Sequence, residues 1–76
     1  MLFEQIREIV AEHLDCEVEE IKEESTFDSL GIDSLDAVEL VMELEEKLNV
    51  QMDLDRDLET IKELVKFVEE KMKDNE

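Results

Sequence analysis

The sequence predicts an all-α fold: a small four-helix bundle of three longer helices and one short helix, with a long loop between the first two helices. Two observations carry this prediction. Proline is absent and glycine occurs once, which suits a helical chain with few sharp turns. Apolar residues recur three and four positions apart in three stretches, which is the period of one helix face. A chain of 76 residues has room for one domain, residues 1–76, and we expect residues 73–76 to fray.

The first expected helix covers residues 2–14. Its apolar stripe consists of Phe3, Ile6, Ile9, Val10 and Leu14. His13, the only histidine, lies near the end of this helix, where a surface or helix-end residue is more typical than a catalyst. Residues 15–32 then form a long connection, and a loop of this length in a small domain needs apolar anchors. The candidate anchors are Val18, Ile21, Phe27 and Leu30.

The second expected helix covers residues 34–48. Asp33 is placed to cap it by accepting hydrogen bonds from free N–H groups of the first turn. One face carries Ala37, Val41, Leu44 and Leu48, with Leu35, Val38 and Met42 to one side. This much apolar surface predicts a central helix packed against several neighbours.

The last expected helix begins near Thr60, where Thr60 and Glu63 have the spacing of a capping box. Its buried stripe consists of Ile61, Leu64, Val65, Val68 and Met72. Residues 49–59 connect it to the preceding helix, and the short helix of the bundle is expected around residues 55–59.

The net charge of −17 argues against nucleic acid and anionic membranes as partners, because their phosphates would repel this surface. It favours a monomer and protein partners with basic patches. The stretch from residue 23 to 46 contains no lysine or arginine and nine acids. They are Glu23, Glu24, Asp28, Asp33, Asp36, Glu39, Glu43, Glu45 and Glu46. We expect salt or magnesium to raise the melting temperature by screening this self-repulsion.

Cys16 is the only cysteine, so an internal disulfide is excluded and a buried structural thiol is expected. The N-terminal residues lack the pattern of a signal peptide, and no apolar run has the length of a membrane span. A reducing cytoplasm is the expected location.

Ser34 is the candidate functional residue, because it follows the only glycine, Gly31, by three positions and opens the second helix. A serine nucleophile needs a base, yet His13 lies on another helix and a Gly-x-Ser-x-Gly elbow is absent. We therefore expect no catalytic residue and no enzyme activity. Ser34 is better placed as the substrate of another protein.

The segment Gly-x-Asp-Ser-Leu at residues 31–35, followed by Asp-x-Val-Glu-Leu-Val-Met-x-Leu-Glu-Glu, resembles the modification site of the acyl carrier protein family. The resemblance runs from about Phe3 to about Met72. It implies an acyl-carrier-like bundle in which 4'-phosphopantetheine, derived from coenzyme A, is attached to Ser34 by a phosphopantetheinyl transferase. The arm would carry growing acyl chains as thioesters and deliver them to acyl-transferring and fatty-acid synthesis enzymes, and the acyl chain would retreat between the helices.

A strip of acidic residues on the second expected helix supports the expectation that partner enzymes bind there. Asp36, Glu39, Glu43 and Glu46 share about a quarter of the helix circumference, although like charges at this spacing destabilise a helix. The resemblance implies docking onto basic enzyme patches. The implied docking residues are Asp33, Leu35, Asp36, Glu39, Met42, Glu45 and Glu46.

The chain departs from the family pattern in two places. Ser29 stands where many members have aspartate before Leu-Gly, with Asp28 displaced by one, and the connection after Met52 is about two residues shorter and has Asp53 in place of the usual proline. These differences leave the pathway open. Polyketide, aminoacyl or D-alanyl, and peptidyl carriers are the alternatives within the family.

An acidic interaction or calcium-binding module is the alternative from another class. Asp53, Asp55 and Asp57 imitate the first ligands of an EF-hand loop, but Leu58 stands where glycine is needed and Leu64 where the bidentate glutamate belongs. We therefore expect no specific metal site.

Overall fold

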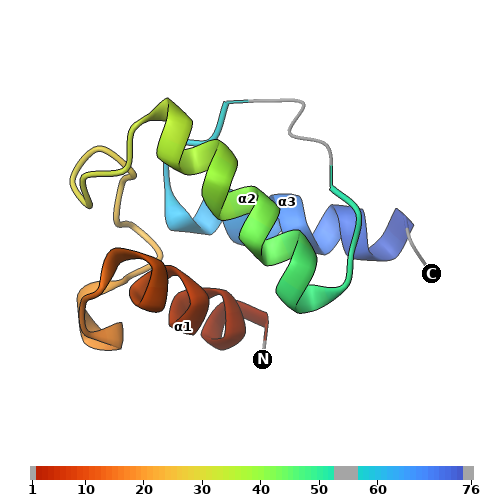
Figure 1. Cartoon of the computed structure of the whole chain (residues 1–76), viewed down its shortest axis with the longest axis horizontal. Coiled ribbons are helices and arrows are strands. Elements are labelled where there is room, and N and C mark those ends of the chain that lie inside the picture. The colour runs from red at the N-terminus through yellow and green to blue at the C-terminus, as the bar shows by residue number, and fades with distance from the viewer. Residues whose placement is uncertain (1, 53–56, 75–76) are drawn as a thin grey trace.

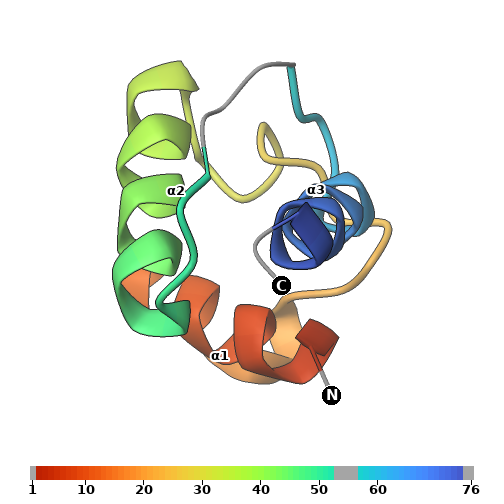
Figure 2. The same cartoon turned by 90° about the vertical axis from the view of Figure 1, so that its right-hand side faces the viewer.

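The computed structural model describes residues 2–52 and 57–74 and contains three α-helices and one short 3-10 turn. The helices are α1 (Leu2–Leu14), α2 (Ser34–Leu48) and α3 (Ile61–Asp74), and the 3-10 turn is η1 (Val18–Glu20). Helix α1 crosses below both other helices and packs against each of them (Figures 1 and 2). The all-α fold class and the starts of the three long helices agree with the sequence prediction.

Two helices end on residues in the left-handed conformation. Asp15 after α1 has φ 57° and Asn49 after α2 has φ 55°. At the end of α2, the Val50 N–H donates to the carbonyl oxygen of Glu45 at 3.1 Å, which satisfies a helix-end carbonyl group. The chain can therefore reverse within two residues and run back beside α2 (Figure 2).

One apolar core joins the three helices and their connections. Its largest fully buried side chain is Phe67, which the expected stripe of the last helix did not include. The other core residues are Ile6, Ile9, Val10, Ala11, Ile21, Phe27, Ile32, Leu40, Val41, Leu44, Met52, Ile61, Leu64, Val65 and Val68. Since Phe67 lies to one side of the Ile61–Val65–Val68 stripe, α3 is buried over a wider arc than its periodicity indicates.

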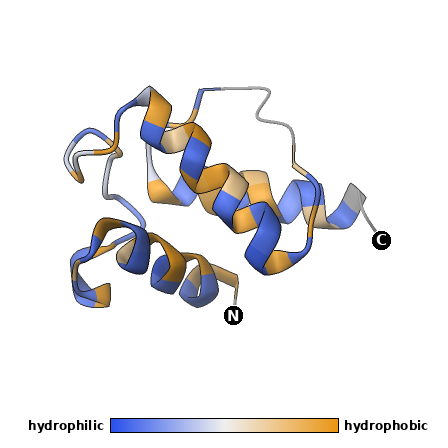
Figure 3. Ribbon diagram, viewed as in Figure 1, coloured by the Kyte–Doolittle hydropathy of each residue, from blue (hydrophilic) through white to orange (hydrophobic). Residues whose placement is uncertain are grey.

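The expectation of a central α2 packed against several neighbours is wrong, because α1 is the helix that packs against both others and three apolar side chains of α2 face solvent. Leu35 is 69% exposed, Met42 61% and Val38 45%. They form an apolar ridge on the outside of a helix whose hydropathy alternates along its visible face (Figure 3). Hydropathy alone does not distinguish an apolar contact surface from a core face.

The long connection after α1 is held against the other elements at several points. Arg7 in α1 donates its Nε–H to the carbonyl of Ile21 at 2.7 Å, and the Ile21 side chain is fully buried. Further along, the Phe27 N–H donates to the Glu59 carbonyl at 2.9 Å. The first bond joins the connection to α1 and the second joins it to the chain entering α3. Ile21 and Phe27 are buried and Val18 and Leu30 pack against the core, so the expected anchors are confirmed.

Two expected details fall at the edge of the described residues. The short helix expected around residues 55–59 lies partly outside them, and residues 57–59 are not helical. The fraying expected of residues 73–76 concerns residues 75 and 76, which are also outside, whereas α3 continues to Asp74. Within residues 2–52 and 57–74, every helix is too short or too polar to cross a lipid bilayer.

Candidate functional site

Ser34 is the first residue of α2, and its side chain is exposed. Asp33 before it has extended backbone, and its carboxylate accepts a hydrogen bond from the Asp36 N–H at 2.8 Å. The Asp33 carbonyl also accepts the Ala37 N–H at 2.9 Å. The expected cap is confirmed, and it fixes the backbone on both sides of Ser34 while leaving the hydroxyl accessible.

A tight turn brings the chain to this helix start. Gly31 has φ 78°, a conformation that L side chains rarely adopt, and a Cβ there would meet open space. The glycine is therefore required by the backbone rather than by crowding. The Gly31 N–H donates to the Asp28 carbonyl at 3.1 Å, and the Ile32 N–H donates to the Phe27 carbonyl at 2.8 Å. The buried side chains of Phe27 and Ile32 hold the turn against the core.

The sequence contains a second Asp-Ser-Leu triplet at residues 28–30, and its serine, Ser29, is also exposed but has a different setting. The Ser29 hydroxyl donates to the Thr26 carbonyl at 2.9 Å, and the Ser29 N–H donates to the Thr26 hydroxyl oxygen at 3.0 Å. Ser29 thus belongs to a closed turn, whereas Ser34 stands at a helix N-terminus, where unpaired N–H groups favour an anionic group.

A groove of about 670 Å³ opens beside Ser34. It lies between the start of α2, the turn before it and the chain entering α3. Its lining residues are Thr26, Phe27, Asp28, Ile32, Asp33, Ser34, Ala37, Val38, Asp57, Leu58 and Glu59. No local pattern in the sequence indicates this groove, because its walls come from three separate segments.

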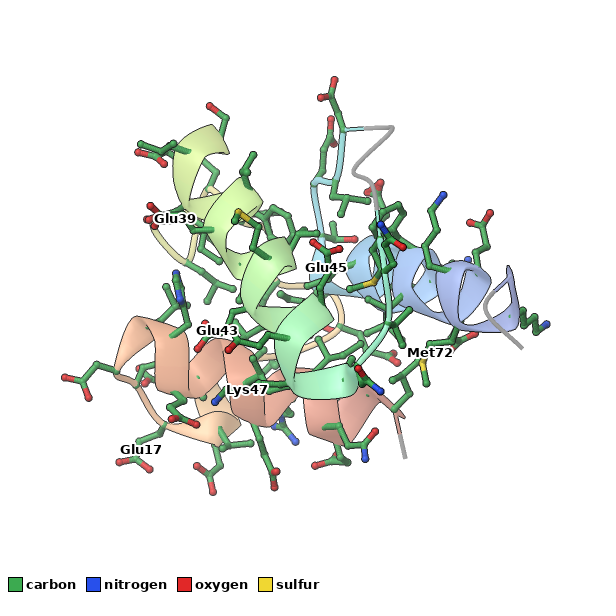
Figure 4. The ribbon with its side chains drawn as sticks, turned by 45° about the vertical axis from the view of Figure 1, so that its right-hand side comes forward. Glu17, Glu39, Glu43, Glu45, Lys47 and Met72 are labelled. Atoms are coloured by element: carbon green, nitrogen blue, oxygen red, sulfur yellow. The ribbon has the colours of Figure 1, made fainter. Side chains whose placement is uncertain are left out.

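Five of the expected docking residues lie together on the outer surface of α2. Leu35 and Met42 belong to the apolar ridge, Glu39 and Glu46 are exposed, and Asp36 is half-buried. Figure 4 shows Glu39 directed away from the other helices. We call these five residues the docking face.

Glu43 belongs to the acidic strip in sequence but has partners within the fold. Its Oε2 lies 2.9 Å from Nδ1 of His13, and its Oε1 lies 3.9 Å from Nζ of Lys47. Lys47 also reaches Glu12 on α1, at 3.4 Å. These side chains form a charged junction between α1 and α2 (Figure 4). His13 thus has a structural contact at a helix end, as its position in the sequence indicates.

Two other expected docking residues have side chains engaged within the fold. The Asp33 carboxylate caps α2, as described above. The half-buried carboxylate of Glu45 accepts the Met52 N–H at 2.8 Å. The sequence indicates that Glu45 lies apart from the acidic strip. Successive residues are about 100° apart around a helix, so Glu45 points away from Glu46 and the other strip residues.

The carboxylate residues Asp28, Asp33, Asp57 and Glu59 line the groove together with Ser34, whereas the only histidine of the sequence lies away from it. His13 contacts α2 at Glu43, nine residues or about two and a half turns from Ser34. In residues 2–52 and 57–74, no group of three or more His, Cys, Asp or Glu side chains could hold a metal ion. Asp53 and Asp55 of the considered EF-hand pattern lie outside these residues.

Cys16 is half-buried rather than fully buried, which corrects the expectation of a buried thiol. Partial burial raises the pKa of the Cys16 thiol, and the nearby carboxylates of Glu20 and Glu17 raise it further. A raised pKa reduces the thiolate fraction at neutral pH, and the thiol is correspondingly unreactive.

Comparisons with known proteins give a matching family, related sequences and a related fold. Residues 4–68 match the family model described as "Phosphopantetheine attachment site". The acyl carrier protein of Streptococcus thermophilus strain CNRZ 1066 is 42% identical over 72 residues, covering 95% of this chain and 97% of that protein. The acyl carrier protein of Phenylobacterium zucineum strain HLK1 is 42% identical over 74 residues, with 93% and 94% covered. A crystal structure of an acyl carrier protein from Thermotoga maritima superposes with a TM-score of 0.79 at 28% identity, covering 95% of this chain and 87% of that one.

Proposed function

We infer that this chain, which belongs to the acyl carrier protein family, takes its 4'-phosphopantetheine arm on the hydroxyl of Ser34. The observation that carries this proposal is the position of Ser34: exposed, at the first position of a capped helix and beside a groove. The negatively charged phosphodiester would sit at the N-terminus of α2, where the helix dipole favours an anion. Ser29 offers no such helix end. Members of this family are carriers and not catalysts.

In the loading reaction, the chain supplies the Ser34 oxygen that receives the phosphopantetheinyl group. When attached, the arm provides a terminal thiol that holds acyl groups as thioesters. In the loading step the Ser34 oxygen forms a bond to phosphorus, and a P–O bond of the coenzyme A pyrophosphate breaks. We propose that the phosphopantetheinyl transferase accepts the hydroxyl proton and binds the leaving group.

The composition of the docking face suits binding to partner enzymes that carry basic patches. Leu35 and Met42 offer apolar contact area, and Asp36, Glu39 and Glu46 offer negative charge beside it. With a net charge of −17, the chain attracts such partners over a distance and repels its own copies. We therefore propose that these five residues bind the partners and that the free chain is a monomer.

The groove beside Ser34 fits the role of a shelter for an attached acyl chain. Phe27, Ile32, Val38 and Leu58 give it apolar walls, and Asp57 and Glu59 lie on its lining too. Apolar chain buried there would be removed from water, which is favourable in proportion to the area covered. A sheltered thioester would also be less accessible to hydrolysis.

Fatty-acid synthesis is the pathway that we propose, because the acidity of the docking face and the Leu-Asp-Ala-Val-Glu sequence at residues 35–39 resemble carriers of that class more than peptidyl carriers. Polyketide, aminoacyl or D-alanyl carriers remain the alternatives. Loading assays with acyl-activating and amino-acid-activating enzymes separate these classes. Exclusive loading with amino acids would reject fatty-acid synthesis.

Intact-mass measurement before and after incubation with coenzyme A and a broad-specificity phosphopantetheinyl transferase tests the attachment site. We expect one phosphopantetheine increment on the unsubstituted chain and on Ser29→Ala, and none on Ser34→Ala. The Ser29→Ala variant is the matched control, since it alters the other Asp-Ser-Leu copy. An increment that persists in Ser34→Ala would overturn the assignment.

A further inference from the structure

We propose that Glu45 is a positioning residue, which uses its side chain to hold the returning segment after α2 and does not act by binding partner enzymes. Its effect on the sheltering of an acyl chain rests on the proposed function, whereas its effect on the fold does not. Glu45 stands one residue from Glu46, which is exposed and belongs to the docking face. Neighbours in sequence therefore have separate roles.

The contacts of Glu45 are with the segment that follows α2. Its main-chain oxygen accepts the Val50 N–H at 3.1 Å, and its side-chain Oε2 accepts the Met52 N–H at 2.8 Å. Asn49, which directly precedes Val50, has the left-handed conformation and reverses the chain. Figure 4 shows the Glu45 side chain on the flank of α2 that faces the returning segment, while Glu43 and Lys47 lie toward α1. The main-chain oxygen of Glu45 also accepts the Asn49 N–H, so this one residue holds the exit from α2 with three hydrogen bonds.

The side-chain bond matters because Met52 is buried. The Met52 residue is 2% exposed, and its N–H would lose its partner if the carboxylate were absent. A buried donor without an acceptor is costly, and hydrogen bonds to charged acceptors are among the stronger ones. The carboxylate therefore favours the arrangement in which Met52 enters the core.

The other end of the connection lines the groove. Past Met52 the chain reaches Leu58 and Glu59, which line the groove. At that end, the Glu59 carbonyl accepts the Phe27 N–H at 2.9 Å, and the Ile61 N–H donates to the Ser25 carbonyl at 3.0 Å. The connection is therefore held at both ends, by Glu45 at its start and by the Ser25–Phe27 segment at its end.

Two conservative variants separate this role from docking. Glu45→Gln keeps the length and the acceptor oxygen but removes the charge, whereas Glu45→Asp keeps the charge but is one methylene shorter. A positioning role predicts damage from Glu45→Asp and near-normal behaviour from Glu45→Gln. A docking role predicts the reverse. Glu46→Gln and Glu46→Asp are the matched controls on the adjacent exposed position.

The first readout is hydrogen exchange of the Met52 amide in the unmodified chain, measured by NMR. We expect Glu45→Asp to accelerate this exchange by about tenfold and Glu45→Gln to stay within about threefold of the unsubstituted chain. Neither Glu46 variant should alter it. Equal exchange in Glu45→Asp and the unsubstituted chain would overturn the proposal, as would faster exchange in Glu45→Gln than in Glu45→Asp.

The second readout is made on the loaded chain. We expect Glu45→Asp to speed hydrolysis of an attached long-chain thioester, with the transferase KM unchanged, and Glu46→Gln to raise that KM with hydrolysis unchanged. A KM raised by Glu45→Gln as much as by Glu46→Gln would assign Glu45 to docking and overturn the proposal. If the chain accepts no phosphopantetheine at all, the proposed function fails, and the exchange experiment still decides the role of Glu45.

Discussion

The first half of α2, residues 34–39, exposes Leu35 and Val38, whereas the second half, residues 40–48, buries Leu40, Val41 and Leu44 and exposes only Met42 among its large apolar side chains. Leu35 and Val38 face solvent at the start of the helix, beside Ser34 and the groove. Further along, Leu40 and Leu44 are at most 1% exposed. The halves also differ in charge contacts, because Glu43, Lys47 and Glu45 bind neighbouring elements. Their counterparts Asp36 and Glu39 belong to the docking face.

This difference shows how a small protein can present a residue and hold it in place with the same helix. The second half is fixed to α1 on one flank and to the returning segment on the other. The first half is then free to offer Ser34, and the docking face, which continues to Met42 and Glu46 in the second half, keeps its orientation. A helix transmits position along its axis because its backbone hydrogen bonds are continuous.

The largest expected effect comes from removing a buried side chain of the second half. Leu44 is fully buried, so Leu44→Ala should lower the free energy of unfolding by about 2–5 kcal/mol. Leu35→Ala, on the exposed ridge, should change it by less than about 0.5 kcal/mol and instead raise the transferase KM. Urea unfolding and transferase kinetics on both variants check this. Equal losses of stability would contradict the division of α2.

A smaller effect is expected at the helix cap before Ser34. Asp33→Ala removes the acceptor of the Asp36 N–H and should cost about 1 kcal/mol of stability, whereas Asp33→Asn keeps an oxygen there and should cost much less. Thermal unfolding compares the two variants. If both lose the same stability, the carboxylate charge and not the capping bond is responsible.

The smallest effect is expected from the most exposed ion pair of the second half. The Lys47–Glu12 distance is 3.4 Å, but both side chains are largely accessible, so the pair should contribute at most about 0.5 kcal/mol. A double-mutant cycle with Lys47→Met and Glu12→Gln measures the coupling. It should vanish at high salt while the melting temperature of the unsubstituted chain rises, because screening also relieves the repulsion of a −17 chain. A coupling that persists in high salt would contradict this.

The sequence was sufficient for the three helices, because each has a clear apolar period and recognisable end signals. It also favours Ser34 over Ser29, since only Ser34 opens a patterned helix, and this choice stays a prediction. Hydropathy alone was insufficient for the exposed ridge, because Leu35 and Met42 are as apolar as core residues, and only the family resemblance placed these two among docking residues. The groove could not be predicted either, since Phe27, Ala37 and Leu58 meet only in the folded chain.

The charged contacts could be predicted only in part. The acidic strip was recognisable, but the sequence did not reveal that Glu43 is paired with His13 across two helices thirty residues apart. The position of Glu45 away from the strip follows from helix geometry. Its partner, a main-chain N–H seven residues later, depends on the chain reversal at Asn49.

The most direct test of the division compares Glu39→Ala with Glu43→Ala, which lie one turn apart on α2 and remove the same charge. Unfolding free energy and transferase KM are measured for both. Because each variant relieves the same kind of repulsion, the difference between them isolates the contacts with His13 and Lys47. We expect Glu43→Ala to be less stable than Glu39→Ala with a normal KM, and Glu39→Ala to keep its stability with a raised KM. Equal stability together with equally raised KM values would show that α2 is one uniform docking surface and would contradict the account.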